Sequence, residues 1–119
     1  MTFKEYVRTA FRWQRGRQNS GYDKLLLVTG TLPIPFDIYL LRFPEGSEIP
    51  EHRDPVEQGK HYRLNVILRK SRMGGEFKCM QPIWASRRIN LFRSDISPHS
   101  VTQVTSGTRY VLSVGWLLR

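Results

Sequence analysis

The sequence predicts a mainly β fold of the sandwich or jelly-roll type, and three observations support this prediction. From Lys24 onward, short segments rich in Val, Ile, Leu, Tyr and Phe alternate with clusters of turn-forming residues. About seven such segments follow one another in 119 residues, the length of one domain. No internal repeat or low-complexity tract interrupts them. Short strands at this spacing are typical of antiparallel sandwiches and jelly rolls.

One helix, over about residues 2–15, is predicted ahead of the strands. Thr2 and Glu5 fit a capping box, and basic residues share one side of the segment. Apolar residues recur at helical spacing on the other side, which would pack on a sheet. These residues are Phe3, Tyr6, Val7, Ala10 and Phe11.

The β core is predicted over about residues 24–118. Turn signals such as Gly74-Gly75 and Ser106-Gly107 separate its segments. Helix and core together make a single domain, residues 1–119. The strands are expected near 24–28, 36–43, 61–69, 76–81, 88–92, 99–104 and 108–117.

The charge balance favours an acidic partner without identifying it. The formal net charge is +9, and arginine, which suits bidentate contacts with phosphate or carboxylate, outnumbers lysine 14 to 5. The basic residues are scattered, so no continuous stripe for a nucleic-acid duplex is visible. The apolar runs are too short for a membrane span. A single cysteine, Cys79, and a first segment without secretory character predict a cytoplasmic protein without a disulfide.

A metal site is predicted from two of the three histidines. His52 and Asp54 are two residues apart, so in an extended segment their side chains point the same way. His99, at the start of a later strand, is placed to supply a third ligand. Two imidazoles and one carboxylate are the ligand set of non-haem Fe(II) enzymes, which leaves open positions for co-substrate and oxygen. His61 is expected to be structural or exposed.

Polar side chains on three other predicted strands indicate a pocket beside the metal. Arg109 begins the last strand, where a buried arginine needs an anionic partner, such as a dicarboxylate co-substrate. Arg63 and Asn65 share one face of the segment 61–69, on positions that are normally apolar inside a barrel. Arg42 is a weaker pocket candidate that by default is solvated.

At these residues the sequence resembles the 2-oxoglutarate- and Fe(II)-dependent oxygenases, over about residues 36–118. Their pattern is His-x-Asp, a distal His and an Arg about ten residues later, which matches His52, Asp54, His99 and Arg109. The segment 99–116 is similar to the prolyl hydroxylases, as is Gly74-Gly75-Glu76. The segment 62–79 is similar to the aspartyl/asparaginyl β-hydroxylases, although the better known members lack the aspartate ligand.

The resemblance implies a double-stranded β-helix, the cupin-like jelly roll, and a role for each residue. His52, Asp54 and His99 would bind Fe(II). Arg109, with Ser113 beside it, would bind the 5-carboxylate of 2-oxoglutarate, and Arg63 its 1-carboxylate. With O2, such enzymes hydroxylate a C–H bond and release succinate and CO2.

The substrate stays open at this stage. The two branches modify protein side chains, so a protein residue is favoured over a nucleic acid, and no membrane partner is expected. One alternative is oxidative modification or demethylation of a nucleic-acid base, which the net charge favours. An alternative of another class is a catalytically silent jelly-roll binding module. The sequence does not decide between monomer and dimer.

Overall fold

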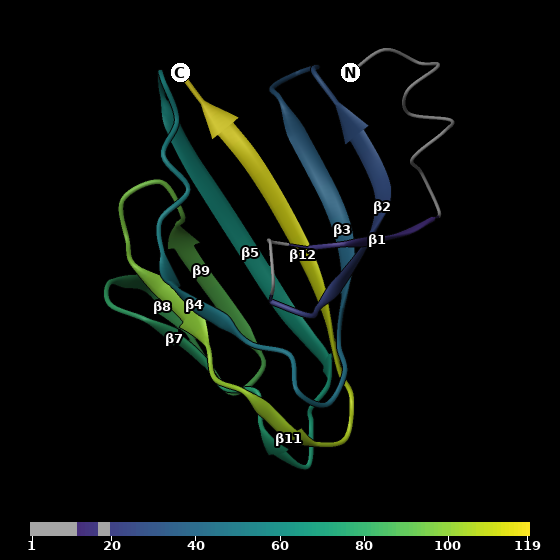
Figure 1. The fold of residues 1–119 in the computed structure, drawn as a ribbon. Helices are drawn as coiled ribbons and strands as arrows, with labels where there is room; N and C mark the ends of the chain where they lie inside the picture. The colour runs from purple at the N-terminus through teal and green to yellow at the C-terminus, as the bar shows by residue number, and fades with distance from the viewer. Residues whose placement is uncertain (1–11, 17–19) are drawn as a thin grey trace.

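A seven-stranded sheet and a three-stranded sheet form two layers, with a two-stranded ribbon at one end (Figure 1). The computed structural model describes residues 12–16 and 20–119. All paired strands are antiparallel. The strands are β1 (Trp13–Arg15), β2 (Asp23–Gly30), β3 (Phe36–Phe43), β4 (Ile49–His52), β5 (Lys60–Arg69), β6 (Met73–Gly74), β7 (Phe77–Cys79), β8 (Pro82–Ala85), β9 (Ile89–Arg93), β10 (His99–Val101), β11 (Val104–Ser106) and β12 (Arg109–Leu118).

The large sheet has the order β1-β2-β3-β12-β5-β9-β8, and the small sheet β4-β10-β7. The chain crosses repeatedly between the two layers, since β4, β7 and β10 separate the strands of the large sheet along the sequence. This confirms the predicted mainly β jelly roll. The long strands β3, β5 and β12 were all predicted to within about a residue at each end. The short strands β1, β4, β6 and β8 were missed, because two to four residues show no periodicity.

The predicted helix over residues 2–15 is wrong in the part that the structure describes. Trp13–Arg15 form β1, in which Trp13 lies opposite Leu25 of β2. Residues 2–11 lie outside the described residues. A short isolated helix gains little in water, whereas β2 offers a row of edge N–H and C=O groups for pairing. Within the described part of the chain, no helix is long and apolar enough to cross a membrane.

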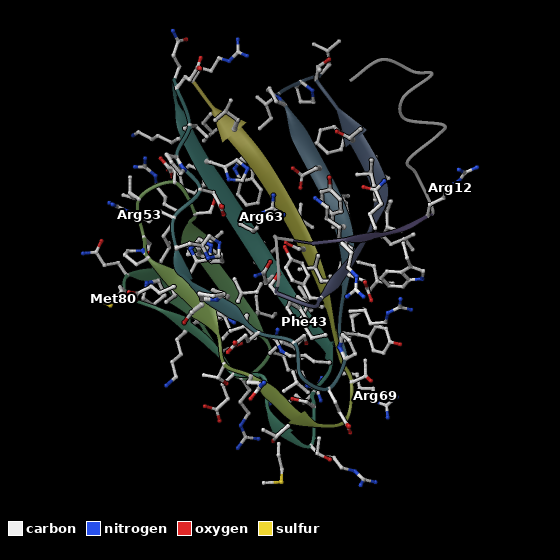
Figure 2. All side chains as sticks on the ribbon, viewed as in Figure 1. Arg12, Phe43, Arg53, Arg63, Arg69 and Met80 are labelled. Atoms are coloured by element: carbon white, nitrogen blue, oxygen red, sulfur yellow. The ribbon has the colours of Figure 1, made fainter. Side chains whose placement is uncertain are left out.

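The inner face of the large sheet combines the core with a line of polar side chains. Every second residue of β12 from Arg109 to Gly115 is buried, and β12 pairs with β3 on one side and β5 on the other. At one end the inner face is apolar, and Tyr22 stacks on Phe43 at a centroid distance of 5.1 Å. Phe43 is buried and Arg63 is half-buried; both are labelled in Figure 2. The polar part of this face creates a pocket instead of a continuous core.

Candidate metal centre

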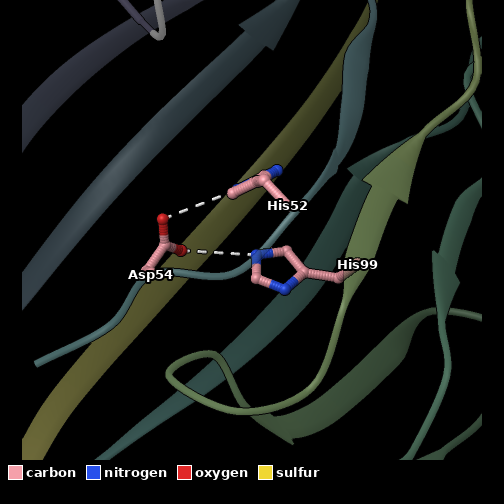
Figure 3. A group of neighbouring side chains, drawn as sticks. All are labelled: His52, Asp54 and His99. Atoms are coloured by element: carbon pink, nitrogen blue, oxygen red, sulfur yellow. Dashed lines mark ion pairs between the residues drawn. The ribbon is translucent and has the colours of Figure 1, made fainter.

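Two neighbouring strands of the small sheet bring together three side chains that could hold a metal ion. His52 ends β4 and pairs with His99, the first residue of β10. Asp54 follows two residues after His52, and one ligand atom from each of the three side chains lies within 4.8 Å of the others. The Asp54 carboxylate lies between the histidines: Oδ1 is 3.6 Å from His52 Nε2, and Oδ2 is 3.3 Å from His99 Nε2 (Figure 3). The sequence prediction of this cluster agrees with the geometry.

Backbone carbonyls orient both imidazoles. His52 Nδ1 lies 2.8 Å from the carbonyl oxygen of Pro50, and His99 Nδ1 lies 2.8 Å from that of Ser97. A carbonyl oxygen only accepts hydrogen bonds, so each Nδ1 carries the proton and donates. In the neutral imidazole the lone pair is then on Nε2, which points at the cluster. This is the arrangement of a histidine prepared to bind a metal.

The spacing of the donor atoms fits a transition-metal ion. Metal bonds to imidazole nitrogen and carboxylate oxygen are about 2.1 Å, so donors at right angles around one ion are about 3 Å apart. The two histidine-to-carboxylate separations, 3.3 and 3.6 Å, are only slightly longer. Three donors from one side leave the other coordination positions free for exogenous ligands.

The Asp54 carboxyl is held in its ionised form. Burial by itself would raise its pKa, but when the two imidazoles are protonated at Nε2 as well, hydrogen bonds and charges from His52 and His99 outweigh burial and lower the pKa far below its usual value. The side chain is still 40% exposed. Asp54 therefore offers a permanent negative charge on the solvent side of the cluster.

A cavity of about 280 Å³ connects this cluster to the inner face of the large sheet. This volume is near the lower end of ligand pockets, about 300–1,000 Å³, and suits a small molecule. The predicted site residues that line the cavity together are His52, Asp54, Arg63, Asn65, His99, Arg109 and Ser113.

Arg109 is a buried cation without an acidic partner among the described residues. Its exposed fraction is only 3%, and its guanidinium lies 5.1 Å from the centroid of the Phe43 ring. Burial lowers the pKa of Arg109 to about 10, so the group stays charged at neutral pH. No ion pair or hydrogen bond joins its side chain to another described residue. An anionic ligand in the cavity would provide the missing countercharge.

Arg63 has partners already. Its Nη2 lies 2.9 Å from Asp37 Oδ1, and its Nη1 donates to Ser113 Oγ at 2.8 Å. The Ser113 hydroxyl in turn donates to Asn65 Oδ1 at 2.6 Å. Asp37, Arg63, Ser113 and Asn65 thus form one chain of contacts across β3, β12 and β5. In this arrangement the Ser113 proton is donated to Asn65, so it is not available to a ligand.

Arg42 does not line the cavity. Neighbouring residues of a strand point to opposite faces, and Leu41 and Phe43 take the inner face of β3. On the outer face, Arg42 pairs with Asp23 at 3.0 Å and lies 4.0 Å from the Trp13 ring centroid. Arg42 is therefore no longer a candidate pocket residue.

Sequence reasoning missed two polar residues of β3. Tyr39 lines the cavity, and Asp37, two residues earlier, is the partner of Arg63. Burial, followed by the Asp37 charge, raises the pKa of the Tyr39 hydroxyl. The signal was the alternation of Asp37, Tyr39, Leu41 and Phe43, which places all four on one face of the segment 36–43.

His61 lies outside the cavity and supports the loop that carries Asp54. Its Nδ1 is hydrogen-bonded to the Ser94 hydroxyl. The Ser94 carbonyl accepts the Asp54 backbone N–H at 2.8 Å. His61 therefore has the structural position expected for it.

Comparison with solved structures supports the fold. The chain matches a Pseudomonas putida prolyl-4-hydroxylase with a TM-score of 0.69 and 14% identity, covering 98% of this chain and 83% of that one. It matches a cupin-2 domain protein from Rhodospirillum rubrum with a TM-score of 0.62 and 13% identity, covering 91% and 70%. It also matches a viral collagen prolyl hydroxylase from Paramecium bursaria Chlorella virus-1, in a 2-oxoglutarate complex. The TM-score is 0.53 and the identity 17%, and the match covers 71% of this chain and 60% of that one.

These identities establish a cupin-like jelly roll and nothing finer. The chain spans about half, 48%, of the chain that it matches in the Rhodobacter sphaeroides complex of SigE with the anti-sigma ChrR, at a TM-score of 0.53 and 19% identity. No family model and no curated protein sequence matches. Because one fold carries many functions, the function has to be argued from the site.

Proposed function

We propose that this protein is a 2-oxoglutarate- and Fe(II)-dependent dioxygenase that hydroxylates a C–H bond of a protein side chain. One observation carries the proposal. A single cavity contains both a set of two histidines and one aspartate and a buried arginine with no acidic partner among the described residues. The first binds a metal, and the second requires an anion.

The chain's own residues account for the binding of both groups. His52, Asp54 and His99 would hold Fe(II) through Nε2, a carboxylate oxygen and Nε2. Arg109 would bind the far carboxylate of 2-oxoglutarate as a charge-assisted, bidentate pair. Bound iron supplies the oxidative chemistry, in which O2, 2-oxoglutarate and the substrate C–H bond give succinate, CO2 and an alcohol.

The cavity walls favour this division of roles. Apolar side chains, including Phe43, Val111 and Phe92, line it beside the polar groups and limit the access of water. A cavity of about 280 Å³ accepts the co-substrate but not a macromolecule. The substrate must therefore approach from outside, where the partly exposed Asp54 marks the solvent side of the metal cluster.

A protein residue remains the preferred substrate, by likeness to prolyl hydroxylases. Two of the matched structures are prolyl hydroxylases, and one of these contains 2-oxoglutarate. This support is associational, because the same fold carries other activities. The first rival substrate is a nucleic-acid base, which the net charge of +9 favours.

An anaerobic spectroscopic titration tests the proposal. Fe(II) and 2-oxoglutarate added to the purified protein should produce the visible metal-to-ligand charge-transfer band of the ternary complex. Asp54→Asn and His99→Ala should abolish the band, because each removes one of three ligands. Glu51→Gln is the matched control: it removes one carboxylate charge from the same strand segment, outside the cluster, and should leave the band intact.

Two results would contradict the proposal. Well-folded wild-type protein without the band would favour a jelly-roll binding module. A band that persists in Asp54→Asn at wild-type intensity and iron affinity would place the metal elsewhere.

A further inference from the structure

A second cavity is lined by β6 and the residues beside it, and the proposed oxygenase reaction does not use it. Figure 1 shows β11, the partner strand of β6, at one end of the molecule. Its volume is about 570 Å³. Two turns form its walls. One comprises residues 70–76, between β5 and β7, and the other contains Ser86 and Arg87, between β8 and β9.

The side chains that line this cavity are strongly basic. Lys70, Arg72, Arg87 and Arg109 contribute four cations, and Glu76 is the only acidic residue among the lining residues. Within the described residues, no carboxylate forms an ion pair with any of these four cations. Lys70, Arg72 and Arg87 are exposed, and Arg109 is buried at the base. We call Lys70, Arg72 and Arg87 the basic rim.

Hydrogen bonds fix the first turn. The Arg72 N–H donates to the Ser106 carbonyl at 2.9 Å, and the Gly75 N–H donates to the Gln103 carbonyl at 3.2 Å. Within the turn, the Ser71 hydroxyl donates to the Gly74 carbonyl at 2.6 Å. The turn is therefore anchored at both ends of β11, so that less conformational freedom is lost when a ligand binds.

Gly75 brings this turn against Arg109. Its φ is +67°, and a Cβ at this position would lie 2.8 Å from Val104 Cγ2 and 3.4 Å from Arg109 Cδ. A side chain here would clash with Val104 and strain the backbone, whereas glycine lets the turn pack against Val104 and contact the Arg109 stem. Arg109 and Phe77 line both cavities, so Arg109 forms part of the boundary between them.

The second turn adds Arg87 to the lining of the cavity. The Ser86 N–H donates to the Ile89 carbonyl at 2.8 Å, and the Ile89 N–H donates back to the Ser86 hydroxyl at 3.2 Å. Ser86 and Asn90, which also line the cavity, offer neutral hydrogen-bonding groups beside the arginine. Cations therefore converge from two separate, hydrogen-bonded turns.

We propose that the basic rim binds the phosphate groups of a ligand. Arginine forks and a lysine, supplemented by hydroxyl and amide groups, match the many acceptor oxygens of phosphate. Phe77 is the only aromatic residue lining the cavity, and it packs on Phe92 at a centroid distance of 5.0 Å. Base stacking therefore has no free platform there, and the site should recognise phosphate rather than bases. The proposal is independent of the oxygenase reaction.

Calorimetric titration tests this directly, without iron or 2-oxoglutarate. The probes are pyrophosphate and, separately, an oligothymidylate single strand, each at several NaCl concentrations. The variant Arg72→Gln/Arg87→Gln should bind at least about tenfold more weakly, because it loses charge-assisted hydrogen bonds. Lys60→Gln/Arg119→Gln is the matched control: it removes the same charge from exposed residues at the other end of β5 and β12 and should bind within about twofold of wild type.

The outcomes are distinct. Binding of pyrophosphate alone identifies a free phosphate ligand, and binding of both probes with the rim-dependent loss identifies the backbone of a nucleic-acid strand. Absence of binding to both probes overturns the proposal. So does an equal loss in the two double variants, because binding would then follow net charge. If Arg72→Gln/Arg87→Gln is unfolded by circular dichroism, the single variant Lys70→Gln replaces it with the same criterion.

Discussion

At the scale of single residues, two arginines of one cavity have opposite surroundings. Arg63 is neutralised by Asp37 at 2.9 Å and also bonds to Ser113. Arg109 is more deeply buried and has no acidic partner among the described residues. A new anion binds more favourably to Arg109, which lacks a countercharge, because Arg63 would first have to give up its ion pair with Asp37. Arg109 is therefore the stronger candidate for the co-substrate carboxylate.

Arg109→Met should weaken 2-oxoglutarate binding by roughly 2–5 kcal/mol, as expected when one partner of a buried charge pair is removed. Methionine keeps an unbranched apolar stem beside Phe43. Arg42→Met is the matched control, since Arg42 also lies over an aromatic ring but on the outer face of β3. Anaerobic titration with 2-oxoglutarate measures both affinities. Wild-type affinity in Arg109→Met would refute the assignment.

His61 should make stability depend on pH. Burial, followed by the Arg63 charge, lowers its pKa from 6.5. The unfolded chain then binds the proton more readily than the folded chain. The contribution of neutral His61 to stability is therefore fully present above pH 6.5 and decreases as the pH falls toward the folded-state pKa. Urea unfolding from pH 8 to 5 should show a smaller decrease in His61→Asn, whose amide does not titrate. Parallel pH profiles for the two proteins would show that His61 does not contribute.

At the scale of elements, strand register decides which polar groups meet. Gly115 of β12 lies between Asp37 of β3 and Arg63 of β5 in the cross-strand register. The Arg63 side chain crosses over it to reach Asp37. A Cβ on Gly115 would lie 2.2 Å from Arg63 Nη2 and 3.1 Å from Asp37 Oδ1. The absence of a side chain there is thus a condition for the ion pair.

Gly115→Ala should lower the free energy of unfolding by about 1–3 kcal/mol, because the displaced guanidinium loses charge-assisted hydrogen bonds. Urea unfolding monitored by tryptophan fluorescence provides the measurement. In an Arg63→Met background the same substitution should cost much less, since the clashing group is absent, and the double-mutant cycle isolates this coupling. Equal costs in the two backgrounds would show that Arg63 is not what Gly115 accommodates.

At the scale of the whole molecule, the two sheets divide the site between them. The small sheet supplies the candidate metal ligands from β4, β10 and the segment after β4, and the large sheet supplies Arg109, Arg63 and Asn65. The cavity lies between these layers. A bound metal would tie β4 to β10 and so stabilise the folded state as a whole.

Metal should therefore raise the thermal stability of the intact chain. Saturation with Fe(II) at about a hundred times its dissociation constant adds about 2.7 kcal/mol to folding. For a domain of this size the Tm should rise by roughly 10 °C. Anaerobic differential scanning calorimetry measures the shift, and His99→Ala should remove it. The same shift in that variant would mean that the metal binds elsewhere.

The mainly β class, the long strands and the three members of the candidate metal cluster could all be predicted from the sequence. These follow from local properties: alternation over eight or ten residues defines β3, β5 and β12, and the His-x-Asp spacing places two ligands on one side of the chain. The helix prediction was wrong at residues 13–15, because these residues pair with β2, a neighbour that the local sequence pattern does not contain.

Which polar residues share the cavity, and which are already paired, could not be predicted from the sequence. Arg42, Arg63 and Arg109 are the same residue type, each on a strand. Packing places Arg42 on the outer face, pairs Arg63 with Asp37 across β12, and buries Arg109 without an acidic partner among the described residues. Whether a charge is exposed, neutralised or ready for a ligand depends on contacts between residues distant in the sequence, and those contacts exist only when the sheets have formed.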